Sequence, residues 1–306
     1  MDYDFIIIGG GPAGLTAGIY AARRNLKTLV IEKALVGGQM QLTPEVGNWP
    51  GEKIISGQDL SKKMEEHAKS SGVEFLRGEV DKLELKGKEK KAHIEQKVLT
   101  CGAVLIAAGG EHRKLGIPGE DKLRGGGVSY CATCDAPFFK EKTVAVVGGG
   151  NTAVEDAIYL SEICSRVYIV HRRDSFRAEE NRVDAMKQKG VVPLMNSVVE
   201  EINGESFVES ITLKDTNSGD IRDIELEGVF VSIGNKPDTK LAEEAGLKLD
   251  EKGYVKVKAN MQTNIPGVFA AGDVVGGILQ ITTAVGEGCT AALSAYDYIK
   301  NPYWSR

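Results

Sequence analysis

Residues 3–33, YDFIIIGGGPAGLTAGIYAARRNLKTLVIEK, begin with a run of aromatic and β-branched residues, turn at a glycine cluster and continue as a helix-forming segment. A second apolar run follows and ends in Glu32. The order strand, glycine turn, helix, strand is typical of a parallel sheet covered by helices. Residues 142–173, KTVAVVGGGNTAVEDAIYLSEICSRVYIVHRR, repeat this order. The sequence therefore predicts one architecture used twice.

Further apolar runs complete the two repeats. Each repeat closes with a run ending near glycine, GAVLIAAGG at 102–110 and EGVFVSIGN at 227–235. Another run, IPGVFAAGDVVGG at 265–277, precedes a helix expected from about Thr282 to Lys300. Because this tail matches the first repeat better, we predict an α/β protein with two Rossmann-like, three-layer ββα dinucleotide-binding domains, the second inserted in the first. The expected ranges are 1–112 with 242–306 for the first domain, and 113–241 for the second.

A smaller element is also predicted near the first repeat. The segment GQDLSKKMEEHAKSSG at 57–72 is expected to form a helix that turns Leu60, Met64, His67 and Ala68 toward the core.

Composition excludes several classes of protein. The 306 residues carry a net charge of -5 and contain no basic block, which disfavours nucleic-acid binding. The N-terminal MDYDFIIIGGG lacks the basic region and the apolar length of a signal peptide. No apolar run approaches the roughly 20 residues needed to span a bilayer. We expect a cytoplasmic protein that binds no membrane.

The first glycine turn predicts a dinucleotide site. Gly9, Gly11 and Gly14 form G-x-G-x-x-G between a strand and a helix. Such glycines permit a tight turn, close approach of a pyrophosphate to backbone N–H groups, and helix packing on the strand. Glu32, at the end of the next strand, is placed to accept hydrogen bonds from ribose hydroxyls.

The second glycine turn predicts a different nucleotide. Gly148, Gly150 and Ala153 form the G-x-G-x-x-A variant. Where an acid would meet a free ribose, the chain instead carries a basic cluster. Guanidinium groups suit a 2′-phosphate, so we expect NADPH rather than NADH. The basic residues are His171, Arg172, Arg173 and Arg177.

Two unlike loops in one chain favour one tightly held cofactor and one that exchanges. Glu32 together with the later Gly272-Asp273 indicates FAD, whose ribityl chain needs such an acid. Hydride is then expected to pass from NADPH to the flavin.

Cys131 and Cys134 are the pair of cysteines with a suggestive spacing. Zinc would need four ligands, and no second Cys or His pair accompanies them. A purely structural disulfide is disfavoured in a chain with no secretion signal. C-x-x-C near βαβ units is typical of a redox-active pair.

Six motifs together resemble the low-molecular-weight thioredoxin reductases, over essentially the whole chain. Among them, C-A-T-C-D is far more specific than either glycine turn. The motifs are the Gly9–Gly14 turn, GNWPG at 47–51, SYCATCDAPFF at 129–139, GGGNTAVEDA at 148–157, HRRDSFRAE at 171–179 and GVFAAGDV at 267–274.

This resemblance implies a homodimeric flavoprotein that passes electrons from NADPH through FAD and the Cys131–Cys134 disulfide to thioredoxin. It implies that Cys134 contacts the flavin, that Cys131 attacks the thioredoxin disulfide, and that Asp135 is the general acid. The implied FAD-binding residues are Gly9, Gly11, Pro12, Ala13, Gly14, Glu32, Lys33, Gly38, Gln39, Asn48, Ala108, Gly109, Gly272, Asp273, Gln280 and Ile281. The implied NADPH-binding residues are Gly148, Gly150, Asn151, Thr152, Glu155, His171, Arg172, Arg173, Arg177, Ile233 and Gly234. No metal site is expected.

One position departs from the family pattern, and several alternatives stay open. Leu279 stands before Gln280, where most members of the family have arginine, which puts any role of that arginine near the flavin in doubt. Alternative readings are a related flavin disulfide reductase with ferredoxin or a deazaflavin as donor, or with a glutaredoxin-like or peroxiredoxin acceptor. A non-enzymatic redox sensor is a further alternative. An aspartate after a turn cysteine also commonly caps a helix.

Overall fold

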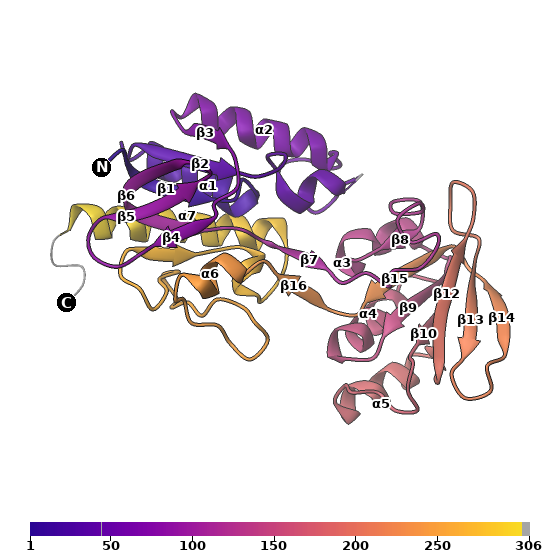
Figure 1. Cartoon of the computed structure of the whole chain (residues 1–306). Helices are drawn as coiled ribbons and strands as arrows, with labels where there is room; N and C mark the ends of the chain where they lie inside the picture. The colour runs from indigo at the N-terminus through magenta and orange to yellow at the C-terminus, as the bar shows by residue number, and fades with distance from the viewer. Residues whose placement is uncertain (44, 302–306) are drawn as a thin grey trace. The chain divides into compact units, whose positions relative to one another are not determined.

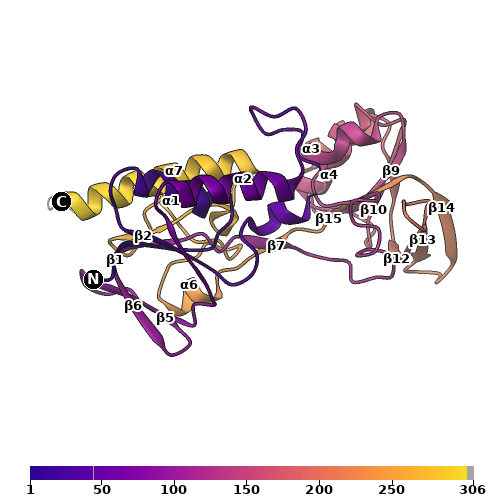
Figure 2. The same ribbon diagram turned by 90° about the horizontal axis from the view of Figure 1, so that it is seen from above.

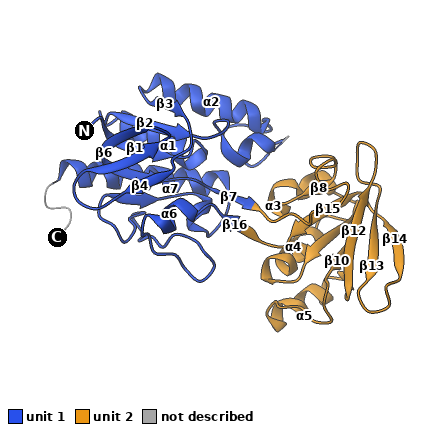
Figure 3. Ribbon diagram, in the orientation of Figure 1, with its two compact units in different colours: residues 1–111, 236–306 blue, residues 112–235 orange. Residues whose placement is uncertain are grey.

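The computed structural model describes residues 1–43 and 45–301 (Figure 1). It divides into two compact units (Figure 3): unit 1 comprises Met1–Glu111 and Lys236–Arg306, and unit 2 comprises His112–Asn235. The chain re-enters unit 1 at Lys236. Soon after this point, Asp238 pairs with Lys33, and Leu241 and Ala242 pack into an apolar cluster of unit 1.

Unit 1 contains a seven-stranded sheet built around the first repeat. β1 (Tyr3–Ile8) pairs in parallel with β2 (Thr28–Glu32) on one side and β6 (Lys97–Ile106) on the other. β3 (Glu74–Arg77) continues beyond β2, and β17 (Val268–Ala270) pairs in parallel with β6. β5 (Lys90–Ile94) and β4 (Lys82–Glu84) extend the sheet in antiparallel fashion. The central strands are buried on both faces, as their continuous apolar runs require.

Three helices cover one face of this sheet (Figure 2): α1 (Pro12–Ala22), α2 (Gly57–Ser70) and α7 (Ile281–Lys300). α1 and α7 approach so closely that a Cβ on Gly288 would lie 2.2 Å from the carbonyl oxygen of Ala13. The short α6 (Lys240–Glu244) belongs to the cluster on the other face. Leu60, Met64 and Ala68 of α2 are buried as expected, whereas the expectation for His67 was wrong. His67 is exposed, and Ser61 occupies the core face instead.

Unit 2 has three layers and is built around the second repeat. Its five-stranded parallel sheet has the order β11 (Val192–Leu194), β10 (Arg166–Val170), β9 (Thr143–Gly148), β15 (Gly228–Ser232) and β8 (Val128–Ser129). One face carries α3 (Ala132–Asp135), α4 (Asn151–Ser161) and α5 (Glu180–Gln188). The other carries the antiparallel sheet of β12 (Ser197–Asn203), β13 (Ser210–Asp215) and β14 (Ile221–Glu225). The prediction of two Rossmann-like units is confirmed.

The two places where the chain crosses between the units are paired with each other. β7 (Gly110–His112) and β16 (Asn235–Pro237) form a two-stranded ribbon. The Asp238 N–H donates to the Gly109 carbonyl, and the Arg113 N–H donates to the Gly234 carbonyl, both at 3.0 Å. Across residues 1–43 and 45–301, no helix has the length and apolarity that a bilayer crossing demands.

Candidate functional site

Each of the three glycines of the first turn is required for a different structural reason. A Cβ on Gly9, whose φ is +108°, would meet the Ala107 carbonyl oxygen at 2.2 Å. A Cβ on Gly14 would meet the Gly9 carbonyl oxygen at 1.9 Å, so the start of α1 packs tightly on the turn. A Cβ on Gly11 would meet nothing within 4 Å. The open position is the one that a pyrophosphate must approach.

Glu32 lies beside this turn and shapes it. Its Oε2 accepts from the Gly10 N–H at 2.7 Å, and its Oε1 accepts from the Ala34 N–H at 2.8 Å. Each carboxylate oxygen keeps a free lone pair for a further donor. A cleft of about 360 Å³ borders Glu32, and its lining includes Leu35, Phe75 and Arg77. The cleft offers apolar walls next to a hydrogen-bond acceptor, which suits a nucleoside.

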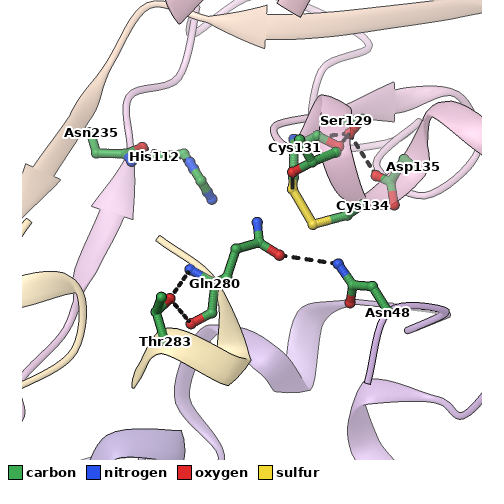
Figure 4. Close-up of a disulfide and its surroundings, with 10 residues drawn as sticks. Asn48, His112, Ser129, Cys131, Cys134, Asp135, Asn235, Gln280 and Thr283 are labelled. Atoms are coloured by element: carbon green, nitrogen blue, oxygen red, sulfur yellow. Dashed lines mark hydrogen bonds between the residues drawn. A yellow bond between two sulfur atoms is a disulfide. The ribbon is translucent and has the colours of Figure 1, made fainter. Parts of the chain in front are cut away.

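Two other residues predicted for FAD meet from distant parts of the chain. The amide nitrogen of Asn48 donates to Oε1 of Gln280 at 3.0 Å (Figure 4). Gln280 is the N-cap of α7, where its side chain and that of Thr283 form a capping box. Leu279, which precedes Gln280, is half-buried.

Asp273 lies at the start of the short helix η3 (Asp273–Val275), directly after Gly272. Burial raises the pKa of its carboxyl. The Gly272 N–H is held by Glu287 of α7, whose Oε2 accepts it at 2.7 Å. Burial also raises the pKa of Glu287. Two half-buried carboxyls thus lie at the same turn, and the sequence predicted one of them.

The remaining residues predicted to bind FAD differ in their position and exposure. Gly38, at the start of the short helix η1 (Gly38–Leu42), lies against the first turn, since a Cβ there would be 3.4 Å from Cα of Gly11. Lys33 is exposed and forms an ion pair with Asp238 at 2.9 Å. Gln39 and Ile281 are half-buried. Pro12 and Ala13 form the first turn of α1, and Ala108 and Gly109 follow β6.

The second glycine turn repeats the geometry of the first. A Cβ on Gly148 would lie 2.4 Å from the Ser232 carbonyl oxygen, whereas a Cβ on Gly150 would meet nothing within 4 Å. The additional Gly149 is constrained by His171, because a Cβ there would fall 2.2 Å from ring atoms of His171. The imidazole of His171 therefore packs directly against the backbone of the turn at Gly149.

His171 is the buried member of the basic cluster. It is 6% exposed, its ring stacks on Phe176, and its Nε2 has no partner among the described residues. Burial lowers the pKa of the imidazole, and the guanidinium groups of Arg177 and Arg173 lower it further. A neutral ring with an orphaned polar atom fits a site completed by a ligand.

The three arginines of this cluster are exposed, and the backbone of one of them, Arg177, bonds to the second glycine turn. The Arg177 N–H donates to the Gly149 carbonyl at 2.8 Å. Arg172 and Arg173 follow β10 directly, with their side chains exposed. Arg173 and Arg177 lie close enough to His171, which packs against the second glycine turn, to lower its pKa.

The residues predicted for NADPH on α4 have protein partners as well. Asn151 exchanges two hydrogen bonds with Glu179, and Glu155 forms an ion pair with Arg182 of α5. Thr152 is exposed, and Ile233 and Gly234 follow β15.

Cys131 and Cys134 form a disulfide with a Cα–Cα distance of 5.3 Å. Cys131 is the N-cap of the four-residue α3, and both cysteines are half-buried. The described parts of the chain contain no group of three His, Cys, Asp or Glu residues able to hold a metal ion. The two sulfurs of this segment are bonded to each other.

Asp135 is the last residue of the redox loop, by which we mean residues 131–135. Its carboxylate accepts a hydrogen bond from a residue that the sequence analysis did not identify. Ser129 donates to Oδ2 of Asp135 at 2.6 Å (Figure 4). Burial raises the pKa of the Asp135 carboxyl, and the bond from Ser129 opposes this rise. A buried carboxyl with a raised pKa, next to a disulfide, is suited to hold and deliver a proton.

The structure therefore fits two dinucleotides and a redox-active disulfide. Four features fit the dinucleotides: the open Gly11, the open Gly150, the free acceptor at Glu32, and the His171 Nε2, which lacks a partner within the described parts of the chain. Sequence reasoning missed Ser129 and Glu287, and the weak signal for the latter was a lone acid between two glycines of α7.

Comparisons with known proteins agree with these features. Residues 3–288 match the family described as "Pyridine nucleotide-disulphide oxidoreductase". The chain is 45% identical over 302 residues to the thioredoxin reductase of Bacillus subtilis, covering 97% of this chain and 95% of that protein. It is 43% identical over 307 residues to the thioredoxin reductase of Escherichia coli O157:H7, covering 96% and 95%. The solved thioredoxin reductase from Streptococcus pyogenes MGAS5005 matches with a TM-score of 0.93 at 41% identity, covering 97% and 98%.

Proposed function

Because the chain belongs to the pyridine nucleotide-disulphide oxidoreductase family, among its thioredoxin reductases, we propose residue roles for thioredoxin-disulfide reduction with FAD and NADPH. The observation that carries the proposal is the Cys131–Cys134 disulfide followed at once by the buried Asp135. This pair lies in the same unit as the second glycine turn and its arginines.

We assign FAD to unit 1 and NADPH to unit 2. The open Gly11, the free lone pairs of Glu32 and the buried Asp273 support the first assignment. Asp273 and Glu32 would hold the ribityl and ribose hydroxyls, while the Asn48–Gln280 pair fixes the start of α7. When bound, FAD accepts a hydride from NADPH and passes two electrons to a disulfide.

Arg172, Arg173 and Arg177 would hold the 2′-phosphate of NADPH. Their exposure and the anchoring of Arg177 on Gly149 support this role. Charge-assisted hydrogen bonds contribute about 1.5–3 kcal/mol each. Two such bonds discriminate NADPH from NADH by at least about a hundredfold.

The cysteines and Asp135 would carry out disulfide exchange in two steps. The Cys131 thiolate attacks one sulfur of the thioredoxin disulfide, and the other thioredoxin sulfur leaves as a thiolate that Asp135 protonates. The Cys134 thiolate then attacks the Cys131 sulfur, which restores the Cys131–Cys134 disulfide and releases the second thioredoxin sulfur. Two electrons move from the cysteine pair to thioredoxin.

We further propose that the enzyme works as a homodimer in the cytoplasm. Both statements rest on the family pattern.

The decisive experiment combines two measurements on the FAD-loaded protein. Stopped-flow mixing with NADPH, NADH and reduced ferredoxin compares the donors, and we expect NADPH to reduce the flavin fastest. Asp135→Asn should leave that step intact while slowing thioredoxin turnover at least tenfold, whereas Asp184→Asn on α5, exposed, should change neither. Normal thioredoxin turnover in Asp135→Asn would refute the acid role. Normal turnover in Cys134→Ser would refute the disulfide route as a whole.

A further inference from the structure

The hydroxyl of Ser129 makes contact with both ends of the redox loop. It donates to Oδ2 of Asp135 at 2.6 Å and accepts from the Cys131 N–H at 3.1 Å (Figure 4). Its oxygen also lies 3.3 Å from the carbonyl oxygen of Cys131. A hydroxyl has one proton to give and two lone pairs, so the bond to Asp135 and the bond from Cys131 can exist together.

The backbone of Ser129 is fixed by the sheet of unit 2. Ser129 is the last residue of β8 and pairs with Phe230 of β15. Ser129 is 4% exposed and Phe230 is 1% exposed. Since neither the strand nor the side chain is free to move into solvent, the hydroxyl is presented from a rigid support.

Few other groups influence the Asp135 carboxyl. Burial raises its pKa and the Ser129 bond lowers it, and no charged group in the described residues contributes a further shift. α4, which packs on α3, carries Glu155 and Asp156. Glu155 is paired with Arg182, and Asp156 accepts from Ser232. Ser129 is therefore the specific partner of Asp135 on the protein side.

We propose that Ser129 is a positioning residue for disulfide exchange: it orients Asp135 for proton transfer and fixes the backbone that presents Cys131. This role rests on the proposed function of Asp135 as the acid. Without the hydroxyl, Asp135 keeps the effect of burial and loses the bond that stabilises its ionised form. The carboxyl then holds its proton to higher pH.

The test is the pH profile of thioredoxin turnover by the FAD-loaded enzyme. Activity that needs a protonated Asp135 declines on the alkaline side as this group ionises. We expect Ser129→Ala to move that decline upward by about one pH unit, which corresponds to about a tenfold change in proton affinity. Flavin reduction by NADPH should stay within about twofold of normal. Difference infrared spectra of the carboxyl should show the same upward shift, independently of turnover.

Two further variants keep the outcome decisive. Ser129→Cys retains the size of the side chain but supplies only a weak donor, so it should give a smaller shift in the same direction. It also serves if Ser129→Ala does not fold. Ser161→Ala is the matched control, because that hydroxyl donates to a carbonyl of its own helix at 2.6 Å. It should leave the profile unchanged.

The results distinguish the proposed role of Ser129 from the proposed role of Asp135 as the acid. If Asp135→Asn abolishes the alkaline decline but neither Ser129 variant moves it, Ser129 has no positioning role. If Asp135→Asn leaves the decline in place, the acid role itself is wrong and the inference falls with it. A shift in the Ser129 variants that disappears in the double variant with Asp135→Asn supports both.

Discussion

The carboxylate of Glu120 accepts a hydrogen bond of 2.8 Å from the phenol hydroxyl of Tyr130, the residue that directly precedes Cys131. Glu120 is 2% exposed and also accepts from the N–H groups of Leu115 and Gly116 at 2.8 and 2.7 Å. The Tyr130 ring stacks on His112 with centroids 5.2 Å apart. The segment before the redox loop is thus tied to the first crossing of the chain.

Tyr130→Phe should destabilise unit 2 without removing the ring stack. Glu120 loses one of its three donors in a buried setting, which costs about 1–2 kcal/mol of the free energy of unfolding. The midpoint of urea unfolding, followed for the holoenzyme, measures this loss. Tyr168→Phe is the control, because Tyr168 is a half-buried tyrosine of β10 in the same unit. Equal midpoints for the two variants would contradict the prediction.

Asp273→Asn should stabilise the FAD-free protein and weaken FAD binding about tenfold. Burial raises the Asp273 pKa above its ordinary 3.8, so ionisation costs stability. This cost is absent below the ordinary pKa and grows as pH rises through the raised value. The gain in melting temperature over the parent should therefore be small near pH 4 and larger at neutral pH. Melting curves and FAD fluorescence titrations check both parts, and a gain independent of pH would refute this account.

Arg173→Ala should weaken NADP⁺ binding about tenfold to a hundredfold while leaving NAD⁺ binding unchanged. The expected loss is that of one charge-assisted bond to the 2′-phosphate. Calorimetric titration with both nucleotides measures the difference directly. Arg222→Ala, an exposed arginine of β14, is the matched control. Parallel losses for both nucleotides would mean that Arg173 does not read the phosphate.

Glu287→Leu should lower the amount of FAD retained on purification, whereas Glu287→Gln should largely restore it. Leucine leaves the buried Gly272 N–H without its acceptor, so the turn that presents Asp273 loosens. Glutamine keeps an acceptor oxygen at the same place. The ratio of flavin absorbance to protein absorbance is the readout. If both substitutions reduced retention equally, the charge of Glu287 rather than its hydrogen bond would matter.

The fold and both glycine turns could be predicted because each leaves a recognisable pattern within a short stretch of sequence. Gly9, Gly14 and Gly148 are required by close backbone contacts within a few residues of each other or on the adjoining strand. The continuous apolar runs of β1 and β9 gave the parallel sheets for the same reason. The pairing of Cys131 with Cys134 could also be predicted, because a C-x-x-C spacing without further metal ligands is typical of a redox-active pair.

The missed features depend on individual side-chain contacts, which leave no periodic pattern in the sequence. Glu287 acts through Gly272, Asn48 meets Gln280, and the Ser129 hydroxyl is significant only because α3 brings Asp135 back to it. The exposed His67 shows a different limit. Its helical spacing fits the core face, but Ser61 is buried there instead, and Gly37 approaches Ser61 closely. A single sequence does not encode such a rotation in its periodicity.

The pairing of β7 with β16 also bears on how such a protein can arise and be re-engineered. Both ends of the segment between β7 and β16 lie side by side in one two-stranded ribbon. The whole segment can therefore be inserted into unit 1, or deleted from it, at this one place. If the segment is deleted, a short linker can join β7 to β16, and the entropy cost of closing such a short loop is small. Recombination would then transfer the residues proposed to bind NADPH and the Cys131–Cys134 disulfide together, as one segment.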